Sequence, residues 1–137
     1  MKHTVAFIGL GVMGQRMLAN MYKIGGFEMI GGWDPNPDAC ADARALVPNF
    51  PIADNPESLI TAPNVDLVYI ACPPAHHKQY ATAAITAGKA IYCEKPLGID
   101  IKESCALVEA VEAAGTIHCV NFSLATAAAV EYIEHGL

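Results

Sequence analysis

Short runs of hydrophobic residues alternate along the chain with segments in which apolar positions recur at helical spacing. The runs predict strands, because buried parallel strands are almost continuously apolar, and the segments between them predict helices. We expect six strands, over residues 3–8, 27–33, 49–53, 65–71, 90–93 and 116–120. Helices are expected from the glycine-rich turn to residue 24, over 38–46, briefly from Asn55, over 75–87 and 100–114, and from Ser123 or Thr126 to Glu134. This alternation predicts an α/β fold, a doubly wound parallel sheet in three αβα layers, with residues 1–137 forming a single domain.

The first strand leads directly into a G-x-G-x-x-G motif formed by Gly9, Gly11 and Gly14. In this motif Gly9 turns the chain, Gly11 lets phosphate oxygens approach the backbone, and Gly14 lets the helix pack on the strand. The free N–H groups of the first helical turn, which contains Val12 and Met13, would then face an anion. Because a strand precedes the glycines and a helix follows them, the motif predicts a dinucleotide-binding site.

Asp34 lies at the end of the second expected strand, 20 residues after Gly14. A carboxylate in this place can accept hydrogen bonds from both hydroxyls of an adenosine ribose, and it would repel a 2′-phosphate. No arginine follows within the next few positions, so NAD is the expected cofactor, and NADP remains the alternative. Asp34 could instead serve only as a turn or helix cap before Pro35.

Ligands of such sheets bind at the carboxyl ends of the strands, where the strand order reverses. Besides the glycine turn and Asp34, the cofactor-binding candidates at these ends are Cys72, Pro73, His77, Glu94, Lys95 and Asn121. Lys95 is the first catalytic candidate, because a nearby nicotinamide cation would lower the pKa of its ammonium group. A structural ion pair with Glu94 or a phosphate contact is the alternative role for Lys95. His77 is the second catalytic candidate, although capping and packing are commoner uses of such a histidine.

Charge and cysteine content narrow the classes of partner and compartment. The net charge of −6 argues against nucleic acid or an anionic membrane as a partner. No apolar run reaches the length of a membrane span, and the N-terminus lacks the layout of a signal peptide. Five cysteines without C-x-x-C spacing predict reduced thiols and a cytoplasmic location. The histidines show no ligand pairing with these cysteines, so no metal site is predicted.

Three further motifs follow the glycine turn: Cys72-Pro73-x-x-x-His77, Ala87-Gly88-Lys89 and Glu94-Lys95-Pro96. In this order and spacing they resemble the glucose–fructose oxidoreductase, inositol dehydrogenase and rhizopine-catabolism (Gfo/Idh/MocA) family. The usual form of the first motif is T-P-x-x-x-H, so Cys72 takes the place of a threonine. The resemblance covers all 137 residues, but only the N-terminal half of the family's proteins.

The resemblance implies an NAD(P)-dependent dehydrogenase that moves hydride between nicotinamide C4 and a carbinol carbon of a sugar, cyclitol or similar small polyol. It implies a catalytic or positioning role for Lys95, often with a cis peptide bond before Pro96. It also implies a Rossmann domain followed by a larger substrate domain, which we expect to be absent from this chain. That domain supplies much of the oligomer interface, so the full-length protein is expected to form a homo-oligomer. The chain departs from the family at Asn121, where many members carry arginine, and at Leu124, where many carry proline.

Two other interpretations remain open. The run Ile8-Gly9-Leu10-Gly11-Val12-Met13-Gly14, with Met17 and Asn20, is similar to the β-hydroxyacid dehydrogenases. Those enzymes usually follow the second strand with asparagine and arginine, and they have no counterpart of Glu94-Lys95-Pro96. The other alternative is a non-catalytic nucleotide-binding or redox-sensing Rossmann module, which would report the level of NAD to a partner.

Overall fold

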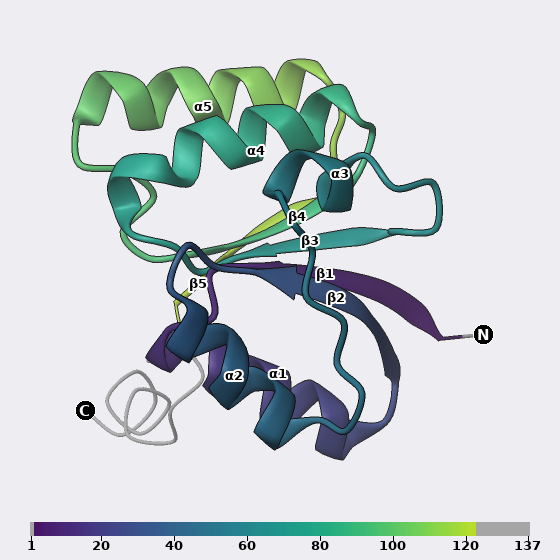
Figure 1. Ribbon diagram of the computed structural model, residues 1–137. Coiled ribbons are helices and arrows are strands. Elements are labelled where there is room, and N and C mark those ends of the chain that lie inside the picture. Colours follow the sequence, from purple (N-terminus) through teal and green to yellow (C-terminus); the bar gives the residue numbers. More distant parts are fainter. Residues whose placement is uncertain (1, 123–137) are drawn as a thin grey trace, which may run out of the picture.

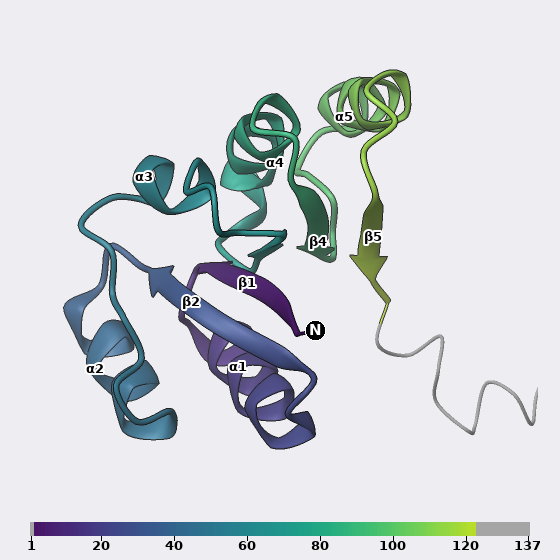
Figure 2. The ribbon, with the colours of Figure 1, turned by 90° about the vertical axis from the view of Figure 1, so that its right-hand side faces the viewer.

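A five-stranded parallel sheet lies between two layers of helices (Figure 1). The structure is a computed structural model that describes residues 2–122. The strands are β1 (His3–Ile8), β2 (Phe27–Trp33), β3 (Leu67–Ile70), β4 (Ala90–Glu94) and β5 (His118–Asn121). The helices are α1 (Val12–Ile24), α2 (Pro37–Leu46), α3 (Pro56–Ile60), α4 (His77–Thr86) and α5 (Ile101–Ala113), with a short 3₁₀ turn η1 (Pro74–His76) before α4. Figure 2 shows α1 and α2 on one face of the sheet and α3, α4 and α5 on the other.

The strand order is β2-β1-β3-β4-β5, and all neighbouring strands are parallel. The chain first places β2 on one side of β1 and then crosses over to place β3 on the other side. The order therefore reverses between β1 and β3, which is the switch point where doubly wound sheets bind their ligands. The predicted fold class, a doubly wound Rossmann-type sheet in three layers, is confirmed.

The prediction of a strand over residues 49–53 is wrong, because this segment makes only a single bridge, between Ile52 and Gly32. Gly32 donates to the carbonyl of Pro51 and accepts from the N–H of Ala53, each at 2.9 Å. Pro51 has no N–H group with which to extend the pairing, and Asn49 has a left-handed backbone with φ of 61°. The other five strands are found with boundaries that differ by at most two residues. The helix expected between residue 123 or 126 and residue 134 lies outside the described residues.

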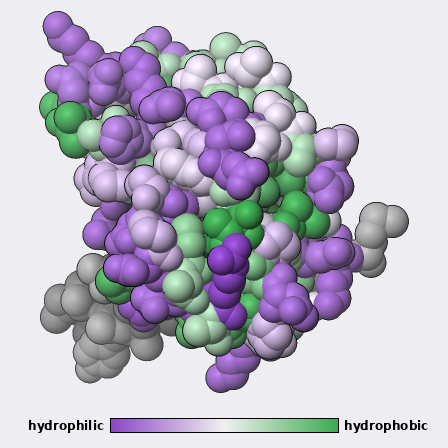
Figure 3. Space-filling view, in the orientation of Figure 1, coloured by the Kyte–Doolittle hydropathy of each residue, from purple (hydrophilic) through white to green (hydrophobic). Residues whose placement is uncertain are grey.

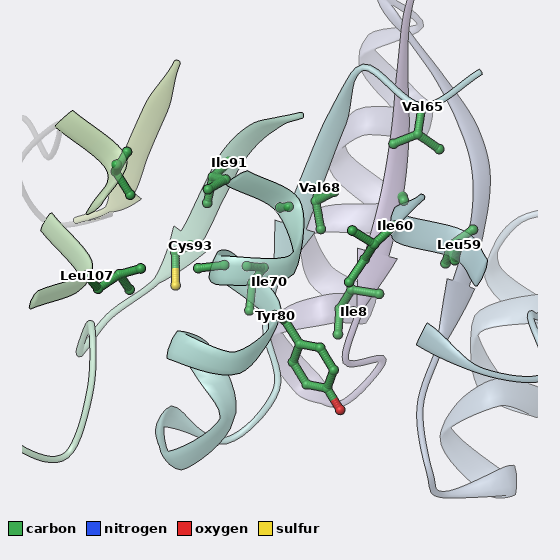
Figure 4. Close-up of a cluster of buried hydrophobic side chains, with 14 residues drawn as sticks. Ile8, Leu59, Ile60, Val65, Val68, Ile70, Tyr80, Ile91, Cys93 and Leu107 are labelled. Atoms are coloured by element: carbon green, nitrogen blue, oxygen red, sulfur yellow. The ribbon is translucent and has the colours of Figure 1, made fainter. Parts of the chain in front are cut away.

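Two hydrophobic clusters, one on each face of the sheet, form the core. Alternate residues of β1 belong to opposite clusters, as the two-residue period of a strand requires. Figure 4 shows the cluster beneath α3, α4 and α5, where Ile8, Val68, Ile70 and Ile91 pack with Tyr80. The opposite cluster, beneath α1 and α2, contains Val5, Phe7, Leu18, Met21, Phe50 and Tyr69. Burial of each such side chain contributes about 1.5–3 kcal/mol to the stability of the fold. Packing on both faces therefore stabilises the sheet between its two helical layers.

The surface agrees with a sheet that is covered on both faces. Figure 3 shows mainly hydrophilic or intermediate residues over the helices, with hydrophobic residues gathered near the level of the sheet. Within residues 2–122, none of the helices combines the length and the apolar character that crossing a membrane requires.

Candidate functional site

The side chains singled out from the sequence meet at one edge of the sheet, because the carboxyl ends of parallel strands lie side by side. The glycine turn follows β1, and Asp34 follows β2. The segments after β3 and β4 carry Cys72, Pro73, His77 and Lys95, whereas Glu94 and Asn121 are the last residues of β4 and β5. Hydrogen-bond contacts connect neighbouring segments of this edge.

The three glycines of the turn have different surroundings. Gly9 has a left-handed backbone, with φ of 96°, and a side chain there would overlap the backbone of Ala71 and Cys72. A side chain at Gly14 would overlap the carbonyl of Gly9. At Gly11, by contrast, a Cβ atom would meet no atom within 4 Å. The fold therefore requires glycine at the first and third positions, whereas the second leaves space for a ligand against the backbone.

The first turn of α1 offers unpaired backbone N–H groups to that space. Gly11 occupies the N-cap position of α1 and provides no side-chain cap, and the first turn of the helix contains no acidic residue. The first backbone bond of this helix runs from the N–H of Gln15 to the carbonyl of Gly11, at 2.9 Å. In α2, α3 and α5, side chains occupy the corresponding position: Asn36, Asn55 and Asp100. The open, positive end of α1 fits the pyrophosphate of a dinucleotide.

Asp34 is half-buried and fixed beside the glycine turn. Its Oδ2 atom accepts a hydrogen bond from the N–H of Leu10 at 2.7 Å, and its Oδ1 atom accepts from the N–H of Asn36 at 2.8 Å. The second contact is the turn-capping role considered from the sequence. Each carboxylate oxygen retains a further lone pair, so the capping role leaves acceptors for ribose hydroxyls.

The segment after β3 places Cys72 against the glycine turn and His77 in the interior. Burial raises the pKa of the Cys72 thiol to about 12, so this thiol is protonated at neutral pH. His77 is 1% exposed, and its two ring nitrogens lie 2.8 Å from the Cys72 carbonyl and 3.0 Å from the Pro96 carbonyl. The ring therefore connects the segments that follow β3 and β4, and it does not reach open space at the edge.

Glu94 and Asn121 form a buried network with Tyr69. The Tyr69 hydroxyl donates to Glu94 Oε1 at 2.5 Å, and Asn121 Nδ2 donates to the same oxygen at 2.6 Å. Burial, assisted by the hydrogen bond to Glu94, raises the pKa of Tyr69 well above its ordinary value. Tyr69 was not among the candidates predicted from the sequence. The available signal was a tyrosine in the most hydrophobic strand, since a buried hydroxyl requires a partner.

Lys95 is exposed at the edge, between two anchored neighbours. The expected cis peptide bond between Lys95 and Pro96 is present. Among residues 2–122, no carboxylate lies within ion-pair distance of Lys95, and Glu94 is directed to Tyr69 and Asn121 instead. The alternative of a structural ion pair between Glu94 and Lys95 is therefore not realised, and the ammonium group is free to meet a ligand. The described part of the chain also contains no group of three potential metal ligands.

Comparison with known proteins identifies the family to which this fold belongs. The family model described as "Oxidoreductase family, NAD-binding Rossmann fold" (GFO_IDH_MocA) matches residues 3–122. The chain is 34% identical to inositol 2-dehydrogenase 4 of Saccharopolyspora erythraea over 112 residues, which are 81% of this chain and 33% of that protein. It is 36% identical to levoglucosan dehydrogenase of Pseudarthrobacter phenanthrenivorans over 107 residues, 75% of this chain and 27% of that protein. The chain thus spans about a third of the length of these relatives.

Solved structures share the fold. Myo-inositol 2-dehydrogenase of Lactobacillus plantarum has a TM-score of 0.87 at 23% identity, over 99% of this chain and 42% of its own. Biliverdin reductase of Synechocystis, solved with biliverdin and NADP⁺, has a TM-score of 0.85 at 23% identity over 96% of this chain and 41% of its own. Sequence motifs, edge geometry and the match over residues 3–122 agree: the chain belongs to the Gfo/Idh/MocA oxidoreductase family and contains its NAD-binding Rossmann fold.

Proposed function

We propose that this chain is the cofactor-binding part of a dehydrogenase in which Lys95 transfers the proton that accompanies hydride transfer. The observation that carries the proposal is the position of Lys95. It is exposed at the carboxyl edge of the sheet, has no ion-pair partner among residues 2–122, and follows a glutamate whose carboxylate is fixed in the interior. The family relationship adds that the domain binds a nicotinamide dinucleotide.

The residues of the edge would hold this cofactor in three places. Gly11 and the N–H groups of Val12 and Met13 would bind the pyrophosphate, and Asp34 would accept hydrogen bonds from the adenosine ribose. Cys72 and Pro73, which adjoin the glycine turn, would line the path towards the nicotinamide. The carboxylate of Asp34 supports NAD over NADP, because a 2′-phosphate next to it would be repelled.

The bound nicotinamide would supply the hydride acceptor or donor. In the oxidation direction, a substrate carbinol loses hydride from carbon and a proton from oxygen, and Lys95 accepts that proton on Nζ. In the reduction direction, Lys95 returns the proton to the alkoxide oxygen as it forms. The positive nicotinamide disfavours the ammonium form of a nearby lysine, which makes the amine available as a base.

The substrate class we propose is a sugar, a cyclitol or a similar small polyol. The names of the relatives support it: they include inositol 2-dehydrogenases and a levoglucosan dehydrogenase. We further propose that the full-length protein is a cytoplasmic homo-oligomer. The free thiols of Cys40, Cys72, Cys93, Cys105 and Cys119 support a reducing compartment.

Titration of the chain with NAD and with NADP tests the cofactor step. Trp33 immediately precedes Asp34, and it is the only tryptophan, so its fluorescence reports binding at the ribose position. We expect a saturable change with NAD at lower concentration than with NADP. An unchanged signal with both cofactors, from a folded sample whose NAD binding is also undetectable by calorimetry, would contradict the proposed site.

Replacing Lys95 with alanine in the full-length dehydrogenase tests the proton step. We expect turnover to fall by about 100- to 10,000-fold, the usual contribution of a positioned acid–base group, with NAD affinity nearly unchanged. Lys89→Ala is the matched control, because Lys89 lies in the same family motifs but its Nζ binds the Ala62 carbonyl away from the edge. Normal turnover in Lys95→Ala would remove Lys95 from the mechanism.

A further inference from the structure

The ring of His77 lies between two backbone carbonyl groups. Nε2 is 2.8 Å from the carbonyl oxygen of Cys72, and Nδ1 is 3.0 Å from the carbonyl oxygen of Pro96. Only 1% of the residue is exposed, so water does not replace either contact. We call this arrangement, Cys72 carbonyl–His77 ring–Pro96 carbonyl, the histidine bridge.

Both partners in the bridge are carbonyl oxygens, which only accept hydrogen bonds, so the ring of His77 is the donor. A neutral imidazole donates through one nitrogen and lies against the second carbonyl with the other. The two ring nitrogens are the only polar atoms of this side chain, so an apolar ring in its place would leave the carbonyl groups without their donor.

The bridge connects the two segments that carry the proposed chemistry. Ile70 of β3 pairs with Cys93 of β4, so the segments after these strands leave the sheet side by side. Cys72 adjoins the glycine turn, and Pro96 follows Lys95 directly. A ring that holds both carbonyls fixes the backbone of Lys95 relative to the cofactor side of the edge.

We infer that His77 is a positioning residue, which orients Lys95 by connecting the carbonyls of Cys72 and Pro96. The inference rests on the proposed function, because it assigns to Lys95 the proton transfer that positioning would serve. His77 itself does not touch the substrate, since both ring nitrogens are occupied and the ring is buried. This role replaces the direct catalytic role considered for His77 from the sequence.

Nuclear magnetic resonance of the chain, labelled with ¹⁵N-histidine, tests the bridge without any activity measurement. A buried N–H group that donates to a carbonyl exchanges slowly with water. We expect a ring N–H signal of His77 that is protected from exchange. His76, adjacent and exposed, is the internal control, and its ring N–H should exchange rapidly. Rapid exchange of the His77 ring N–H in a folded chain would overturn the bridge, whatever the role of Lys95.

A double-mutant cycle in the full-length dehydrogenase tests the positioning role. His77→Gln keeps one donor and His77→Phe keeps the ring volume without donors, so at least one folded variant is expected. We expect turnover to fall by about 10- to 100-fold, as small misplacements of a catalytic group do, with NAD affinity retained. In a Lys95→Ala background the same substitution should have little further effect, because His77 acts through Lys95. His76→Gln is the matched control.

The outcomes separate the two proposals. Full turnover in Lys95→Ala would refute the proposed function, and the nuclear magnetic resonance result would still stand for the bridge. Loss of turnover in Lys95→Ala together with full turnover in folded His77→Phe would refute only the positioning role. An equal loss from His77→Phe in both backgrounds would also refute it, since the histidine would then act independently of Lys95.

Discussion

Asp34 accepts a hydrogen bond from the backbone N–H of Leu10, with 2.7 Å between Oδ2 and the nitrogen. The bond joins the end of β2 to the glycine turn after β1. The side chain proposed to bind the ribose therefore also supports the turn proposed to bind the pyrophosphate. Changes at Asp34 should affect both parts of the dinucleotide site.

Asp34→Ala should weaken NAD binding by about 10- to 100-fold, since hydrogen bonds to a charged group contribute roughly 1.5–3 kcal/mol. NADP binding should fall less, because the substitution also removes repulsion of the 2′-phosphate. Asp34→Asn keeps an oxygen that can accept from Leu10, so it should retain the turn and show an intermediate NAD affinity. Calorimetric titration of both variants measures the effect. Wild-type NAD affinity in folded Asp34→Ala would contradict a ribose contact.

Alanine substitutions should separate the structural glycines of the turn from the ligand-binding one. Gly11→Ala adds a methyl group where the chain itself has no atom within 4 Å, so folding should be nearly unchanged and NAD binding strongly reduced. Gly14→Ala would overlap the Gly9 carbonyl and should destabilise the fold by about 1–3 kcal/mol or more, as overpacking does. Urea unfolding and NAD titration measure the two effects.

Gly26→Ala is the control for both substitutions. A Cβ atom at this position would come no closer than 3.9 Å to a neighbouring atom. Gly26 directly precedes β2 and so lies at the amino end of that strand, away from the carboxyl edge. It should change neither NAD affinity nor, beyond about 0.5 kcal/mol, the free energy of unfolding. If Gly11→Ala bound NAD as well as Gly26→Ala does, the pyrophosphate would not lie against Gly11.

Much of the fold could be predicted from the sequence because its signals are local. Continuous apolar runs and glycine or proline stops locate β1, β2, β3, β4 and β5 to within two residues. The helices expected from Asn55 and from residue 100 are present, and the side chains of Asn55 and Asp100 cap them by accepting from the N–H groups of Ser58 and Glu103. The segment over residues 49–53 was mispredicted because its hydrophobicity resembles a strand, whereas Pro51 and the backbone of Asn49 prevent a continuous ladder.

The candidate site was predictable in position but not in its side-chain contacts. The strand ends indicated which residues share an edge, since parallel topology alone determines this. The directions of Glu94 and His77 depend on packing between residues 19 to 27 positions apart. The sequence therefore left open an ion pair between Glu94 and Lys95, whereas in the structure Glu94 binds Tyr69 and Asn121.

Stability should fall at alkaline pH, because burial raises the pKa of Cys93 from 9.0 to about 12. Between these values the unfolded chain carries a thiolate while the folded chain keeps its proton, so raising the pH favours unfolding. The free energy of unfolding should lose about 1.4 kcal/mol per pH unit from this thiol in that window. Cys72, with a pKa also raised to about 12, adds to the slope.

Cys93→Ala should therefore reduce the slope of stability against pH by that amount, whatever it does to stability at neutral pH. Cys105→Ala, which removes an exposed thiol, is the control and should leave the slope unchanged. Urea unfolding between about pH 8.5 and 10.5 measures both slopes. Equal slopes in the wild-type chain and Cys93→Ala would show that the thiol titrates normally in the folded state.

The network of Glu94 with Tyr69 and Asn121 allows the charge of Glu94 to be separated from its acceptor oxygen as a source of stability. Glu94 is 5% exposed, and both of its described donors are neutral groups that bind the same oxygen. Glu94→Ala would leave a buried hydroxyl and a buried amide without their acceptor and would open a cavity. We expect it to lower the free energy of unfolding by about 2–4 kcal/mol.

Glu94→Gln keeps an acceptor oxygen of nearly the same size and removes the buried charge. Burying a carboxylate among neutral donors is costly, so this variant should lie within about 1 kcal/mol of the wild-type stability. Urea unfolding of the two variants, with Glu109→Gln on the exposed face of α5 as the control, measures the difference. If Glu94→Gln were as unstable as Glu94→Ala, the charge rather than the acceptor would hold the network. In that case a positive group would have to lie near Glu94, and the side chain of Lys95 would be the first to examine.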